Sequence, residues 1–87
     1  METSITRDEF LRLLPAAVGP FHLEGDTATH ADGGRAWTIR LVPLPACRLG
    51  SLSVPRLRVE IALEGYAEAE AAEFMARFRR GFLRGGG

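Results

Sequence analysis

The segment from residue 56 to residue 64 constrains the fold most, because hydrophobic residues occupy every second position in it. The hydrophobic positions are Leu57, Val59, Ile61 and Leu63, and the charged positions between and beside them are Arg56, Arg58, Glu60 and Glu64. A β-strand places successive side chains on opposite faces of its sheet. The pattern therefore predicts an antiparallel strand with one buried and one solvent-exposed face. Other parts of the chain must cover the buried face.

The first covering element is a helix that begins near Arg7. Thr6 and Glu9 have the spacing of a capping box, in which each residue satisfies a free backbone amide of the other. A hydrophobic stripe at helical spacing follows, made by Phe10, Leu11, Leu14 and Val18. Pro15 lacks a backbone donor, so we expect a break or kink there and an end by Gly19-Pro20.

A second amphipathic helix follows Gly65. Its hydrophobic positions recur every three or four residues, at Ala67, Ala71, Phe74, Phe78 and Phe82. Glutamates come early in this segment and arginines late, which is the arrangement that the helix dipole favours. Gly85, Gly86 and Gly87 then predict a flexible glycine tail.

Two segments before residue 45 have the alternating pattern of strands, and together they predict a β-hairpin around Asp32-Gly33-Gly34. In the preferred register these three residues form the loop, which sets Thr29 opposite Trp37 and Asp26 opposite Arg40, with Phe21 and Leu23 directed inward. A two-residue loop would instead bring Ala28 and His30 to the core face, because a slip of one residue exchanges the two faces.

The segment from Pro43 to Pro55 contains three prolines and a glycine, so it reads as a loop. It is more hydrophobic than a solvated loop needs to be, which predicts that it covers another surface. The hydrophobic residues that make it a candidate partner-binding surface are Leu44, Leu49, Leu52 and Val54.

These elements predict an α+β fold of one domain over residues 1–84, followed by the glycine tail at 85–87. The expected architecture is a two-layer sandwich in the order α-β-β-β-α, with three or four antiparallel strands and both helices on one face. We expect its core to contain Phe10, Leu14, Phe21, Trp37, Ile39, Leu41, Leu57, Val59, Ile61, Leu63, Phe74 and Phe78.

Charge is balanced overall but arranged in blocks. Eleven basic and eleven acidic residues cancel among the 87 residues, which argues against nucleic acid or an anionic membrane as partner. Residues 35–58 nevertheless hold five arginines and no acidic residue. Arg40, Arg56 and Arg58 are a candidate anion-binding set on the exposed sheet face, because guanidinium groups bind phosphate or carboxylate oxygens in pairs. The alternative is that these arginines form ordinary cross-strand ion pairs on a solvated sheet face.

No catalytic residue, metal site or cofactor is predicted. His22, His30 and Cys47 match no zinc-ligand spacing, and Glu60 and Glu64 are better explained as salt-bridge partners than as paired catalytic carboxylates. With a single cysteine and no signal segment in the sequence, we expect the cytoplasm of a bacterium as the setting.

The end of the chain, Leu83-Arg84-Gly85-Gly86-Gly87, resembles the diglycine tail of ubiquitin-like modifiers and sulfur carriers. That resemblance implies a terminal-glycine carrier. Proteins of that family open with a hairpin and extend the tail from a final strand, whereas this sequence predicts a helix at both places.

The function expected first is a small, non-catalytic module that binds another protein or itself, as a homodimer. An exposed sheet face, a strand edge and a hydrophobic Pro-bounded segment offer it more binding surface than a solitary small domain needs. An anion- or nucleic-acid-binding regulatory domain that uses the arginine face is the alternative, and the terminal-glycine carrier is the third hypothesis.

Overall fold

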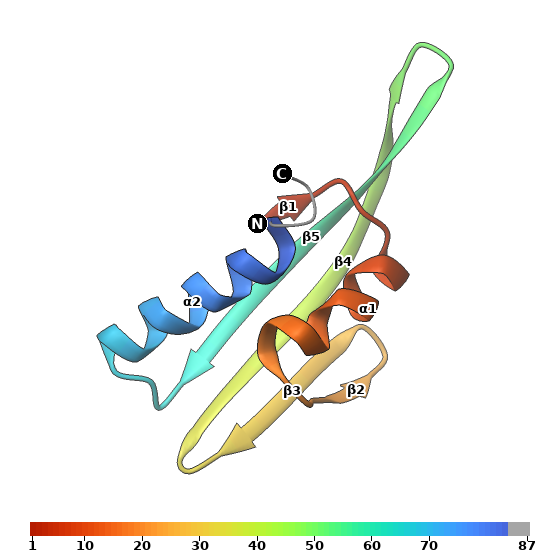
Figure 1. Cartoon of the computed structure of the whole chain (residues 1–87). Helices are drawn as coiled ribbons and strands as arrows, with labels where there is room; N and C mark the ends of the chain where they lie inside the picture. The colour runs from red at the N-terminus through yellow and green to blue at the C-terminus, as the bar shows by residue number, and fades with distance from the viewer. Residues whose placement is uncertain (84–87) are drawn as a thin grey trace.

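The computed structural model describes residues 1–83 and shows two helices on one face of a five-stranded antiparallel sheet (Figure 1). The elements in chain order are β1 (Glu2–Thr3), α1 (Arg7–Val18), β2 (His22–Glu24), β3 (Thr27–Asp32), β4 (Arg35–Leu49), β5 (Leu52–Glu64) and α2 (Glu68–Leu83). The sheet order is β1-β5-β4-β3-β2. The α+β class is confirmed, whereas the prediction of three or four strands in the order α-β-β-β-α is wrong.

The two additional strands come from segments with weak sequence signals. β1 is two residues long, and it forms because the Met1 carbonyl accepts a hydrogen bond from the Val59 amide at 2.6 Å while the Met1 amino group donates to the Val59 carbonyl at 3.0 Å. β2 and β3 replace one expected strand, because the chain reverses at Gly25, whose φ is +61°. Glycine adopts this left-handed conformation without steric cost.

The β3–β4 hairpin has the two-residue loop, so the preferred register is wrong by one position. His30 lies opposite Trp37 and Ala28 opposite Ile39. Gly33 and Gly34 both have positive φ, which is the type I′ geometry that matches the twist of paired strands. Ala28 is consequently fully buried, and Leu23 lies exposed on the edge strand.

The same shift separates Asp26 from Arg40. Thr27 lies opposite Arg40, and the Asp26 carboxylate instead pairs with the Arg7 guanidinium of α1. The Asp26 carbonyl accepts a hydrogen bond from the Leu41 amide at 2.8 Å. The turn between β2 and β3 is thereby tied to the helix layer and to β4.

The capping box that begins α1 is confirmed, with the Thr6 hydroxyl accepting from the Glu9 amide and the Glu9 carboxylate accepting from Thr6. The expected break at Pro15 is wrong, because α1 runs through Pro15 to Val18. A proline removes one hydrogen bond, and here the Pro15 carbonyl still accepts from the Gly19 amide at 2.8 Å. The helix ends at the predicted Gly19.

The core lies between the helices and the odd-numbered face of β5. The buried hydrophobic cluster contains Phe10, Leu14, Ala28, Trp37, Ile39, Leu41, Leu57, Val59, Phe74 and Phe78. Nine of these ten were predicted, and Phe21, Ile61 and Leu63 are partly buried against them. Rings from both helices meet at Phe10, which stacks on Phe82 with centroids 4.5 Å apart and lies 6.1 Å from Phe78.

Residues 43–55 do not form the expected loop. They continue β4 and β5 into a two-stranded ribbon that projects from the sheet (Figure 1). Prolines are tolerated here because each lies where the ladder needs no amide, as described below. Residues 84–87, which include the predicted glycine tail, lie outside the described residues.

Candidate functional site: a projecting β-arm and its groove

The ribbon of residues 43–56, called the arm from here on, is the most distinctive feature of the surface. β3 pairs with β4 only as far as Arg40, and β1 pairs with β5 only at Leu57 and Arg58. Beyond these positions the two strands of the arm have only each other as ladder neighbours. The arm extends the molecule to 49 × 28 × 19 Å.

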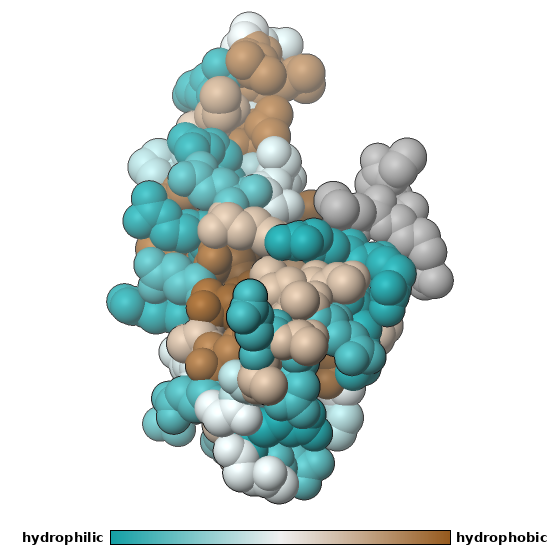
Figure 2. All heavy atoms as spheres, turned by 90° about the vertical axis from the view of Figure 1, so that its left-hand side faces the viewer, coloured by the Kyte–Doolittle hydropathy of each residue, from teal (hydrophilic) through white to brown (hydrophobic). Residues whose placement is uncertain are grey.

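The arm ends in a tight turn that exposes two leucines. Leu49 pairs with Leu52 across Gly50 and Ser51, and Gly50 has a φ of +63° at the first turn position, as a type II′ turn requires. The Leu49 and Leu52 side chains are 61% and 66% exposed. Figure 2 shows hydrophobic side chains gathered at the end of the arm, at the top of the view.

The four predicted partner-binding residues come together on one side of the arm. Leu44 pairs with Arg56, Cys47 with Val54, and Leu49 with Leu52, so their side chains share the sheet face that carries no helix. Leu44 and Val54 are half-buried. This face of the arm, made by Leu44, Cys47, Leu49, Leu52 and Val54, is called the arm face below.

A bulge and three prolines shape the edges of the arm. Pro45 and Ala46 together oppose Pro55, where the ladder register shifts. The Val59 amide and carbonyl bond to Met1, away from β4, and by alternation Pro55 also faces that outer edge. The Leu41 amide bonds outward to Asp26, which places Pro43 on the opposite outer edge. Each edge therefore lacks at least one donor that an added strand would need.

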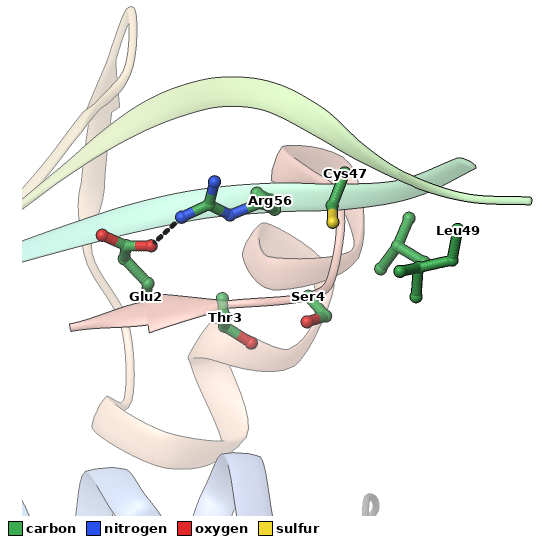
Figure 3. A pocket seen from close by; sticks show the side chains of 7 residues that line it. Glu2, Thr3, Ser4, Cys47, Leu49 and Arg56 are labelled. Carbon is green, nitrogen blue, oxygen red and sulfur yellow. Dashed lines mark hydrogen bonds and ion pairs between the residues drawn. The ribbon is translucent and has the colours of Figure 1, made fainter. Parts of the chain in front are cut away.

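A groove with a volume of about 300 Å³ lies between the arm and the N-terminal segment (Figure 3). It is lined by Glu2, Thr3, Ser4, Cys47, Leu49, Val54 and Arg56. The Cys47 thiol points from the arm toward the N-terminal segment at Ser4, and the Glu2–Arg56 ion pair bounds one end of the groove. Sequence reasoning missed the N-terminal residues and Cys47, because no pattern indicated that the first residues pair with β5.

The three arginines of the candidate anion site do lie on the helix-free face, but carboxylates match them. Arg40 Nη1 is 3.6 Å from Glu60 Oε1, Arg56 pairs with Glu2, and Arg58 Nη2 is 3.9 Å from the other Glu2 oxygen. Their side chains remain between 44% and 67% exposed. Exposed pairs of this kind contribute little stability, and they occupy the groups that an anion would use.

The remaining candidates do not assemble into a site. His30 lies beside Trp37, with ring centroids 6.1 Å apart, whereas Cys47 is on the arm. Within residues 1–83 no group of three or more histidine, cysteine or acidic side chains is placed to hold a metal ion. A second, more polar pocket of about 230 Å³ lies beside α2, and its lining groups already contact each other, since Arg35 pairs with Glu70 at 2.9 Å and lies over the Tyr66 ring at 5.6 Å.

Comparison with known proteins identifies no family for this chain. No family model, curated protein or solved structure matches the chain. Across the described part of the chain, both helices are too short or too polar to cross a membrane. The arm and its groove are therefore the features from which a function can be inferred.

Proposed function

We propose that this protein is a small, non-catalytic interaction module of the bacterial cytoplasm, and that the arm face and the adjoining groove bind a protein partner. The observation that carries the proposal is the exposure of Leu49 and Leu52 at the end of a projecting arm. Burying a leucine side chain is worth about 1.5–3 kcal/mol. Because the core of the domain lies elsewhere, Leu49 and Leu52 contribute this burial energy only when a partner covers the tip of the arm.

The shape of the arm supports binding through side chains rather than through strand addition. Pro43 and Pro55 remove amide donors from its two outer edges, as derived above, and proline on an edge strand is a common protection against uncontrolled pairing. The arm face has no such protection. A hydrophobic patch beside a groove, with charged groups at its rim, has the composition of a small protein–protein contact.

The anion-binding alternative has weaker support, because Arg40, Arg56 and Arg58 each have a carboxylate neighbour. It requires those ion pairs to exchange for phosphate or carboxylate ligands. The third hypothesis, a terminal-glycine carrier, rests on residues 85–87, which lie outside the described part of the chain. Neither alternative uses the exposed leucines.

Site-specific photocrosslinking in living cells tests the proposal. A benzoylphenylalanine probe replaces Ser51, so that it lies at the tip while Leu49 and Leu52 remain. We expect a discrete protein adduct that disappears when both leucines are changed to serine. A probe at Leu13, which is 41% exposed on α1, is the matched control. No adduct above that control, or an adduct that is insensitive to loss of the leucines, contradicts the proposal.

A further inference from the structure

We infer that the partner of the arm face is a second copy of this chain, with the helix-free sheet faces of the two copies packed together and their arms antiparallel. This inference rests on the proposed function and names its partner. Three properties of the surface support it: the shape of the arm face, the position of other hydrophobic residues on the same sheet face, and the distribution of charge over that face.

The arm face is self-complementary in shape. A two-fold contact uses the same patch on both copies, so that patch must carry both a projection and a recess. Leu52 projects at the tip with 66% exposure and is not part of the groove wall. The groove beside it has a hydrophobic wall made by Cys47, Leu49 and Val54. Because Leu52 shares a face with these residues, each tip can enter the region of the other's groove.

The hydrophobic surface continues from the arm onto the sheet. Val42 lies opposite Arg58 and Leu44 opposite Arg56 on the face that carries no helix, and both hydrophobic side chains are only half-buried. An antiparallel arm reaching past its partner's groove therefore meets further hydrophobic side chains. Their exposed area would be covered in the same contact.

Charge on this face is divided between the arm and the rest of the sheet. On this face the arm carries Arg56 and no acidic residue, a sum of +1, because Arg48 pairs with Ser53 and lies on the opposite face of the arm. Among the described residues, the remainder of the helix-free face carries Glu2, Glu24, Glu60 and Glu64 against Arg40 and Arg58, a sum of −2. An antiparallel arrangement places each basic arm over its partner's acidic surface, whereas a parallel one places arm on arm.

The available area is sufficient for a dimer. A stable contact buries about 800 Å² on each partner, and the accessible surface of the described chain totals 5898 Å². The molecule extends 49 × 28 × 19 Å, so its broadest face measures 49 × 28 Å. An overlap of roughly half of that face gives a contact of the required order.

Sedimentation equilibrium tests the dimer directly. The wild-type protein is expected to sediment at twice its chain mass of 9.5 kDa. Leu52→Ser is expected to weaken association at least about tenfold, because it removes a buried leucine from each side of the contact. Leu13→Ser, at another exposed leucine, on α1, is expected to leave association unchanged. Thermal unfolding of each variant shows whether the fold is retained.

Alkylation of the native Cys47 identifies the surface. The thiol is exposed in a single copy, so its reaction with a maleimide should be slow at concentrations that favour the dimer and fast in Leu52→Ser. A protein that stays monomeric at all concentrations overturns the inference. If the photocrosslinking probe at Ser51 then captures a different protein, the proposed function as an interaction module is still supported. A dimer in which Cys47 stays reactive and Leu52→Ser has no effect also overturns the inference.

Discussion

Replacing Gly81 with alanine is expected to destabilise the protein, because Gly81 of α2 lies against Ala17 of α1. A Cβ atom at position 81 would be 2.5 Å from the Ala17 Cβ and 3.0 Å from its Cα. Carbon atoms in good contact are about 3.5–4.0 Å apart. Both groups are attached directly to helix backbone, so neither can rotate away. The helices must move apart by about 1 Å to restore a normal contact.

The cost of that movement follows from what lies beside the contact. Phe10 of α1 stacks on Phe82 of α2 with centroids 4.5 Å apart and also packs near Phe78, so separation of the helices loosens the aromatic core. Overpacking of this kind costs about 1–3 kcal/mol, while alanine gains up to about 1 kcal/mol over glycine in a helix. We expect a net loss of about 1–2 kcal/mol and a fall in Tm of roughly 5–15 °C.

Urea unfolding followed by the fluorescence of Trp37, the single tryptophan, measures the change. The double variant Ala17→Gly with Gly81→Ala restores one methyl group to the contact and should recover about 1–2 kcal/mol relative to the two single changes added together. Ala72→Gly, on the exposed side of α2, calibrates the helix-propensity term. A Gly81→Ala protein as stable as the wild type would refute the close approach of the two helices.

Three further substitutions test the fold by the same unfolding assay. Phe78→Ala empties a fully buried site and should cost about 3–5 kcal/mol; a loss below about 1 kcal/mol would mean that this ring is not in the core. Thr6→Ala removes the helix cap and should cost about 1 kcal/mol, with Thr6→Ser retaining most of the stability. Pro15→Ala restores an amide donor within α1 at an exposed position and should stabilise the protein by about 1–3 kcal/mol; no gain would show that the helix already accommodates the proline.

Local patterns in the sequence determined most of the hydrophobic layer. Alternation over residues 56–64 placed Leu57 and Val59 in the core, and spacing of three and four placed Phe74 and Phe78 there. The capping box at Thr6 marked the start of α1. These predictions held because each depends on neighbours within a few residues, where periodicity alone identifies the buried side.

Pairing between distant segments was decided only by the tertiary structure. The hairpin register depends on whether two or three residues turn at Gly33-Gly34, and local sequence allows both. β1 exists because Met1 reaches Val59, a contact between residues 58 positions apart, and nothing in the first three residues indicates a strand.

In the arm, one property was predictable from the sequence and another depended on strand pairing. The hydrophobic residues Leu44, Leu49, Leu52 and Val54 marked this segment as a binding surface from sequence alone, but its prolines indicated a loop. In the sheet those prolines lie at outward-facing edge positions and at a bulge, where β4 and β5 need no amide from them. Composition therefore determined that the segment is hydrophobic, and the strand pairing determined that its leucines project into solvent as an arm.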